Sequence, residues 1–212
     1  RSGTSVLSLS GNIRLDAVVA QGCRPIGEPM FVTRAKRNLV LELDERPPME
    51  ILQELYERLE EEDQHLFRSS LFLGIGMEGG KDVYCQGDFL IRNLLGIDRA
   101  SGALAVGAIP EERAVVQFHL RDAKTSASDL RSLLARHKME STTAAAAGLL
   151  FTCCGRGKGL YGVPDHDAGL FAEFFPGVPL GGFFANGEIG PVRGSTFVHG
   201  YTSSFGIIRS AE

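Results

Sequence analysis

The sequence predicts a mixed α/β protein of the α+β kind, with helices covering a partly antiparallel sheet or sheets. Short apolar runs with period two are interleaved with stretches that have helical spacing. Turn-rich breaks at hairpin spacing separate several of the predicted strands, which favours antiparallel pairing. The 212 residues are 43% hydrophobic and 23% charged, ordinary values for a soluble domain that can bury a sizeable core.

Strands are expected wherever apolar residues alternate or form a short run. Leu7 and Leu9 alternate with serines and are followed by a turn at 10–12 and a second alternating run, which predicts an N-terminal hairpin. In the run that ends at Arg121, His119 falls on the polar side and is expected to face solvent or to lie at the rim of the sheet. The remaining strands are predicted within 37–44, 70–77, 89–122, 147–153, 179–190 and 196–209.

Three helices are predicted. The stretch 46–63 begins with two prolines and places leucines on one face, so it predicts one amphipathic helix. The stretch 125–139 predicts a second helix, with Ser126 and Asp129 as a capping box. The stretch 165–177 predicts a third helix, capped by one of its first aspartates.

A glycine-rich loop follows the strand 147–153 and raises several alternatives. Gly157, Gly159 and Gly162 satisfy the dinucleotide-binding spacing, but the loop does not open directly into a helix. Cys153 and Cys154 offer a thiol nucleophile, and strand alternation lets only one of them reach a given pocket. No metal-ligand spacing is present, which argues against structural zinc, whereas haem ligation by a single histidine leaves no spacing signature.

A second glycine-rich cluster lies downstream, at residues 179–209. It carries Asn186, Glu188, His199 and Tyr201 at predicted strand ends or turns, where glycines let a ligand approach the backbone. Asn186 and Gly187 are also expected to form the turn of a hairpin. The net charge of −4 argues against a nucleic-acid partner, and no apolar run is long enough to cross a membrane.

Several motifs resemble the FIST family, named for F-box and intracellular signal transduction proteins. They are QGCRPIG at 21–27, CCGRG at 153–157, GFFANGEIGP at 182–191 and HGYTSSFGIIR at 199–209. The resemblance covers nearly the whole chain. It implies that residues 1–31 end the N-terminal half of the FIST module and that residues 32–212 form the C-terminal domain.

The resemblance also implies an intracellular sensory module rather than an enzyme. Its expected ligand is a small metabolite such as an amino acid, with no cofactor, although some family members are described as haem-based nitric oxide sensors. The alternatives are a protein-interaction scaffold, as in F-box ubiquitin-ligase adaptors, and thiol chemistry at Cys153 or Cys154. We expect a cytoplasmic location and a signalling or ubiquitin-ligase partner.

The predicted ligand site joins the two glycine-rich clusters with the segment around Cys23. Arg24 or Arg156 would bind a carboxylate, and Glu188 would bind an ammonium group. The full predicted set is Cys23, Arg24, Cys153, Cys154, Gly155, Arg156, Gly157, Asn186, Glu188, His199 and Tyr201.

Overall fold

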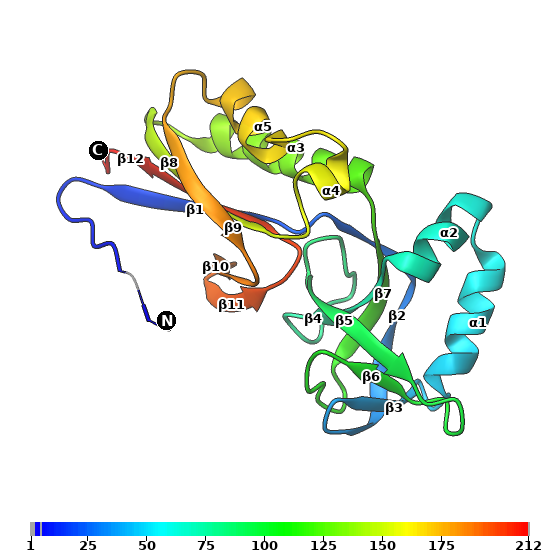
Figure 1. The fold of residues 1–212 in the computed structure, drawn as a ribbon. Helices are drawn as coiled ribbons and strands as arrows, with labels where there is room; N and C mark the ends of the chain where they lie inside the picture. The colour runs from blue at the N-terminus through cyan, green and yellow to red at the C-terminus, as the bar shows by residue number, and fades with distance from the viewer. Residues whose placement is uncertain (1–2, 5, 212) are drawn as a thin grey trace.

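The computed structural model describes residues 3–4 and 6–211, which form a six-stranded barrel beside a four-stranded sheet (Figure 1). Helices cover one face of the sheet and one side of the barrel, so the predicted α+β class is confirmed. Among these described residues, no helix is both long and apolar enough to cross a bilayer.

The barrel closes because its first strand is long enough to pair on both sides. β2 pairs with β7 through its first half and with β3 through its second half, with a register shift between Ile26 and Met30. Such an irregularity lets a strand bend around a barrel. In barrel order the strands are β2 (Cys23–Lys36), β3 (Leu39–Leu43), β6 (Leu104–Val106), β5 (Phe89–Ile97), β4 (Leu71–Gly76) and β7 (Val115–Arg121).

Two helices, α1 (Pro48–Arg58) and α2 (Glu61–Ser69), pack on the outside of the barrel (Figure 1). The prediction of a single helix over 46–63 is therefore wrong at its C-terminal end. Leu59 takes an extended conformation that ends α1, and α2 begins two residues later. The break lets both helices place apolar side chains against the curved barrel surface.

The sheet contains β1 (Arg14–Ala20), β12 (Ser203–Arg209), β8 (Ala145–Cys153) and β9 (Leu180–Ala185), in that order. The first three strands are antiparallel, and β9 runs parallel to β8. The predicted N-terminal hairpin is wrong because β1 pairs with β12 at the other end of the chain. That pairing places Val18 and Ala20 in the core beneath the helices.

Helices α3 (Ala123–Glu140) and α5 (His166–Phe174) cover one face of this sheet, and the short α4 (Lys158–Tyr161) precedes α5 (Figure 1). The predicted capping box is wrong, because Asp122 is the N-cap of α3 and its side chain accepts from the Thr125 N–H. Ser126 and Asp129 instead bind the backbone of residues 21–22.

A separate hairpin of β10 (Glu188–Val192) and β11 (Ser195–His199) lies between the sheet and the barrel (Figure 1). The hairpin predicted around Asn186 and Gly187 is wrong, because β9 pairs with β8 and β10 pairs with β11. The chain does turn there, at Gly187 with a φ of 107°.

His119 on β7 is buried, so its predicted exposure to solvent is wrong. Its ring packs against Phe89 with centroids 5.0 Å apart, and its Nδ1 lies 3.0 Å from the Gln117 carbonyl. Burial lowers the pKa of His119 to about 4, although the hydrogen bond opposes that shift. Both faces of β7 are covered, which a period-two pattern cannot show.

The barrel and the sheet are joined by two neighbouring stretches of chain, residues 21–22 and 121–122. We call these two stretches the joint. Gln21 Nε2 donates to the Phe89 carbonyl in the barrel, while the Gln21 N–H donates to Asp129 on α3. The expected domain boundary between residues 31 and 32 falls within β2.

Candidate functional site

The glycine loop begins where β8 leaves the sheet, and it is held from both sides. The Cys153 N–H donates to the Thr202 carbonyl at 2.9 Å, and the Cys154 N–H donates to the Ala185 carbonyl at 2.8 Å. Cys153 is buried and Cys154 is exposed, as the alternation of the strand predicts.

Arg156 of this loop points into the protein, where Asp167 binds its Nε and Nη2 while its buried Nη1 has no hydrogen-bond partner among the described residues. Its Nε and Nη2 donate to the two carboxylate oxygens of Asp167 at 2.7 and 3.1 Å. Asp167 also accepts from the Thr152 hydroxyl and lies 3.0 Å from Nδ1 of His166. The ion pair attaches the loop to the first turn of α5. The Nε and Nη2 groups of Arg156 are therefore not available to a ligand.

Glu188 meets the glycine loop through one residue, Thr202. The Glu188 carboxylate accepts from the Thr202 hydroxyl at 2.8 Å, and the carbonyl of Thr202 accepts from Cys153. Burial raises the pKa of Glu188, while Thr202 and the charge of Arg156 act to lower it. The two glycine-rich clusters therefore converge, but Glu188 lies beneath the surface rather than on the wall of a cavity.

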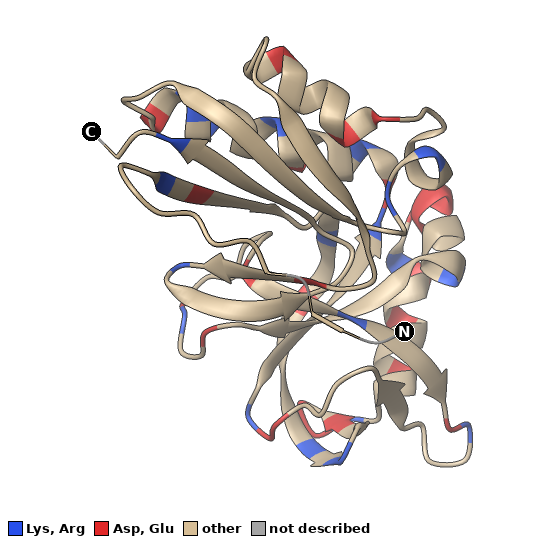
Figure 2. Ribbon diagram, turned by 60° about the vertical axis from the view of Figure 1, so that its left-hand side comes forward, with Lys and Arg blue, Asp and Glu red and all other residues tan. Residues whose placement is uncertain are grey.

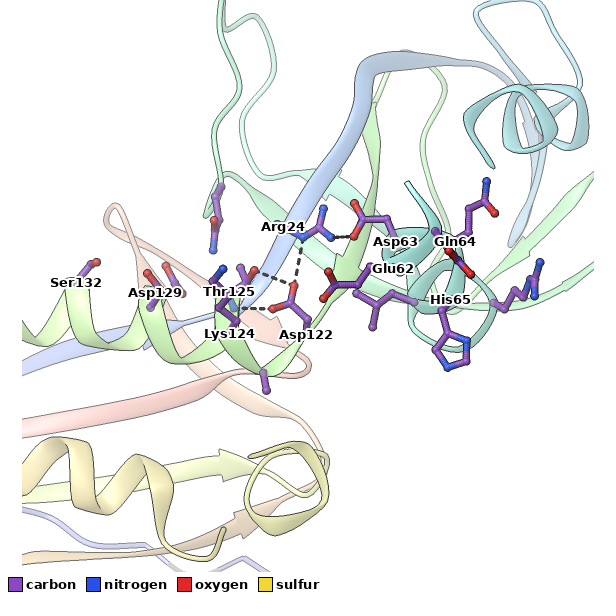
Figure 3. Close-up of a pocket in the computed structure, with 16 residues that line it drawn as sticks. Arg24, Glu62, Asp63, Gln64, His65, Asp122, Lys124, Thr125, Asp129 and Ser132 are labelled. Carbon is purple, nitrogen blue, oxygen red and sulfur yellow. Dashed lines mark hydrogen bonds and ion pairs between the residues drawn. The ribbon is translucent and has the colours of Figure 1, made fainter. Parts of the chain in front are cut away.

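Arg24 lies on the other side of the joint, in a groove of about 1,440 Å³ between α2 and α3 (Figure 3). Its guanidinium binds Asp63 of α2 and the N-cap Asp122 of α3, the latter at 3.2 Å. Burial lowers the pKa of Arg24, but the two carboxylates outweigh that effect and raise it. Arg24 thus links β2 to α2 and to the N-cap of α3, and it does not line the cavity that contains His199 and Tyr201. Asn186 is exposed at the turn before β10.

His199 and Tyr201 line an open cavity of about 530 Å³ between barrel strand β5 and hairpin strand β11. The barrel contributes Arg92 and Asn93 to it, and the chain after β11 contributes Gly200. This volume lies within the range of small-molecule sites. One wall of the cavity belongs to the barrel. The other wall belongs to the hairpin and to residues 200–202, which connect β11 to the sheet strand β12.

Tyr201 holds a conformation that favours glycine, with a φ of 65°. Its ring packs 4.5 Å from the Phe72 ring, and the Arg121 guanidinium lies 5.0 Å from its centroid. Its hydroxyl donates to Asn93, and Arg121 in turn donates to the carbonyl of Gly155 in the glycine loop. Backbone strain of this kind is maintained only where the surroundings enforce it, and it is frequent at functional sites.

Arg92 is the main charged group in this cavity. Its guanidinium donates to the carbonyls of Ile91 and Val198, each at 3.0 Å, and no carboxylate among residues 3–4 and 6–211 pairs with it. Burial lowers the pKa of Arg92, and burial together with the Arg92 charge lowers that of His199. A guanidinium without a carboxylate partner, beside a neutral imidazole, forms a site suited to an anion.

The four thiols divide by exposure. Cys23 and Cys153 are buried, whereas Cys85 and Cys154 are exposed. Burial raises the pKa of Cys23 to about 12, which leaves it protonated at neutral pH. Brief iodoacetamide treatment of the folded protein should label Cys85 and Cys154 and spare the other two, as peptide mass spectrometry can measure. Rapid selective labelling of Cys153 would instead support thiol chemistry at the loop.

Comparison with known proteins places the chain in a family. The family model of the FIST C domain matches residues 48–191, and that of the FIST N domain matches residues 1–46. The chain belongs to the FIST family. FIST domains are associated with sensing in signal transduction.

Several FIST relatives are longer than this chain. An uncharacterized protein of Mycobacterium tuberculosis is 46% identical over 191 residues, which are 90% of this chain and 50% of the relative. A Mycobacterium bovis protein is 43% identical over 190 residues, which are 90% of this chain and 49% of the length of that protein. The chain spans about half the length of these relatives. Human F-box only protein 22 is 36% identical over 104 residues, 47% of this chain and 25% of the human protein.

Reasoning from sequence identified two polar residues of this cavity, but missed the polar residues that the barrel contributes. His199 and Tyr201 were found through their glycine neighbours, whereas Arg92 and Asn93 lie within the barrel strand β5. One signal was present. Arg92 places a cation between Leu90 and Leu94 on one side of a strand, where an apolar residue is expected.

Proposed function

We propose that this chain is the ligand-binding part of a sensory signal-transduction protein. Its ligand is a small molecule with an anionic group, and the carboxylate of an amino acid fits best. The observation that carries the proposal is Arg92, a half-buried guanidinium in a cavity with carbonyls but no described carboxylate as partners. A ligand carboxylate would supply the missing counter-charge.

The placement of the cavity suits sensing, because a ligand there touches two parts of the protein at once. Arg92 and Asn93 belong to the barrel, while His199 and Tyr201 connect the hairpin to the sheet. A ligand that binds both walls favours the arrangement in which they are close together. The resulting shift would reach the glycine loop through Arg121, which contacts both Tyr201 and Gly155.

The ammonium group of an amino-acid ligand would not bind Glu188, which the sequence predicted as its partner. Glu188 does not line the cavity, so an ammonium group would meet the amide of Asn93 and nearby carbonyls instead. The neutral state of His199 leaves Arg92 as the cavity's cation at neutral pH.

Calorimetry with a panel of amino acids and dicarboxylates tests this proposal. The unmodified protein should bind at least one of them, and Arg92→Met should weaken that binding roughly tenfold to a hundredfold, the usual value of a charge-assisted hydrogen bond. Arg99→Met, an exposed site in the turn after β5, should bind as the unmodified protein does. Binding that survives Arg92→Met, or no binding across the panel, would remove the proposal.

Three of the five histidines do not fit a haem. His119 and His199 are buried and each lies within hydrogen-bond distance of a backbone carbonyl, and the ring of His166 stacks on Tyr161 at 3.6 Å. The cavity beside His166 has only about 210 Å³, smaller than is usual for ligand sites. We therefore propose a small polar ligand rather than a haem.

An interaction role is the second candidate, and the similarity to F-box only protein 22 favours it. In that case the chain would present a surface to a signalling or ubiquitin-ligase partner. The two roles are compatible, because ligand occupancy of the Arg92 cavity can alter a surface elsewhere on the same chain.

A further inference from the structure

The strand β9 is an unprotected edge of the four-stranded sheet. In the order β1-β12-β8-β9 it pairs with β8 alone among the residues that the structure describes, and residues 181–184 are all exposed. Edge strands are normally protected by lysine, proline or a bulge. The sequence LGGFFA of β9 contains no charged residue and no proline. Figure 2 shows charged residues on the helices, on the loops and on some of the other strands.

The free edge of β9 presents backbone groups at alternate residues. The carbonyls of Pro179 and Ala185 accept hydrogen bonds from β8. Because backbone groups alternate in direction along a strand, the N–H and C=O groups of Gly182 and Phe184 point away from β8. They are available to another strand.

A small cavity of about 210 Å³ lies beside this edge, on the face that the helices cover. Its apolar wall is formed by Leu150, Leu180 and Phe184. Its other wall is the start of α5, including Asp165 and Asp167, next to Gly157 of the glycine loop. A strand added to β9 would direct every second side chain toward this cavity.

The charge of the cavity indicates which side chain it accepts. Asp167 is neutralised by Arg156. Asp165 takes part in no ion pair among the described residues, so its carboxylate is the uncompensated charge at the rim. A lysine or arginine side chain of a partner fits this cavity, because its aliphatic part would lie along Leu150 and Phe184 and its cation would reach Asp165. The guanidinium of an arginine can also stack on the phenyl ring of Phe184.

We propose that β9 binds an extended peptide segment of a partner protein, which adds a fifth strand and inserts a lysine or arginine side chain into this cavity. Recognition would combine backbone hydrogen bonds along the edge with one side-chain pocket, a common mode of peptide binding. A second copy of the chain fits less well, because its own β9 carries no basic residue to place beside Asp165. This proposal concerns a surface separate from the Arg92 cavity, and either can fail without the other.

Fluorescence polarisation with labelled heptapeptides tests the proposal. The probe is Thr-Val-Thr-Arg-Thr-Val-Thr, compared with peptides that carry lysine, serine or glutamate at the centre. We expect arginine and lysine to bind more tightly than serine, and glutamate to bind least. Asp165→Asn should reduce the preference for arginine over serine about twofold to fivefold, the size expected for a partly exposed ion pair. Asp82→Asn, an exposed aspartate in a barrel loop, should not change it.

Amide hydrogen exchange locates the peptide and separates the alternatives. Bound peptide should slow exchange at the N–H groups of Gly182 and Phe184, and an alternately N-methylated probe should not bind. No binding of the arginine peptide, or binding without this protection, would overturn the proposal. Protection of the same amides without peptide, together with a dimer in sedimentation, would assign the edge to a second copy and also overturn it.

Discussion

Asp167→Asn is expected to lower the free energy of unfolding by about 3–5 kcal/mol at pH 7, the usual cost of breaking a buried ion pair. The side chain of Arg156 is fully buried, and that of Asp167 is 6% exposed, so solvent does little to screen the pair. Asparagine preserves the shape of the aspartate but leaves the guanidinium charge without its counter-charge. Urea denaturation followed by circular dichroism measures the change.

The pH dependence of the same variant provides an internal check. Burial acts to raise the pKa of Asp167, but Arg156 outweighs it, and the pKa is lowered to about 2. A carboxyl with a lowered pKa stabilises the folded state above its ordinary pKa, and that stability is lost as pH falls. The difference between unmodified protein and Asp167→Asn should therefore shrink by about 2 kcal/mol between pH 5 and pH 2.

Glu173→Gln on the same helix is the matched control for Asp167→Asn. Glu173 pairs with Arg131 at 2.9 Å, but both side chains are more than half exposed. Removing that charge should cost less than about 1 kcal/mol. If Asp167→Asn costs no more than Glu173→Gln, the Arg156–Asp167 pair does not hold the glycine loop on α5.

Most elements of this fold could be predicted from sequence, but their pairing could not. Short apolar runs located β3, β4, β5, β7 and β8, and the alternation predicted that Cys153 and Cys154 face opposite sides. The long barrel strand β2 (Cys23–Lys36) was missed. The partner of β1 is β12, almost two hundred residues away, and local patterns carry no signal for such a contact. The turn at 10–12 suggested a nearer partner, which the core beneath α3 overrides.

The candidate site shows the same limit at the level of side chains. Glycines correctly indicated that the loop and the segment around Tyr201 come together, and Thr202 is where they meet. Arg156 was assigned to a ligand because nothing in the sequence shows that Asp167, eleven residues later, folds back onto it. Partners of charged residues depend on tertiary structure, so a sequence cannot tell a structural arginine from a free one.

Gly22→Ala is expected to destabilise the protein by about 3 kcal/mol, through two effects that add. Gly22 lies in the joint with a φ of 72°, a conformation that costs other residues about 1–2 kcal/mol. A Cβ atom there would also lie 2.5 Å from the Ser126 Oγ and 2.9 Å from the Ser126 Cα. Overpacking of this kind costs about 1–3 kcal/mol, and the backbone atom cannot move aside without shifting α3.

Gly80→Ala separates the two effects, because Gly80 has a φ of 75° and nothing within 4 Å of an added Cβ. It should cost only the conformational part, about 1 kcal/mol.

Because Gly22 connects the barrel to the sheet, the Gly22→Ala variant should also disturb the Arg92 cavity, whose walls come from both parts. We therefore expect Gly22→Ala, but not Gly80→Ala, to weaken binding of whichever carboxylate the unmodified protein binds. If the two variants lowered the free energy of unfolding equally, Ser126 would be able to move away from the added Cβ atom without cost. The joint would then not hold the barrel and the sheet in a fixed arrangement.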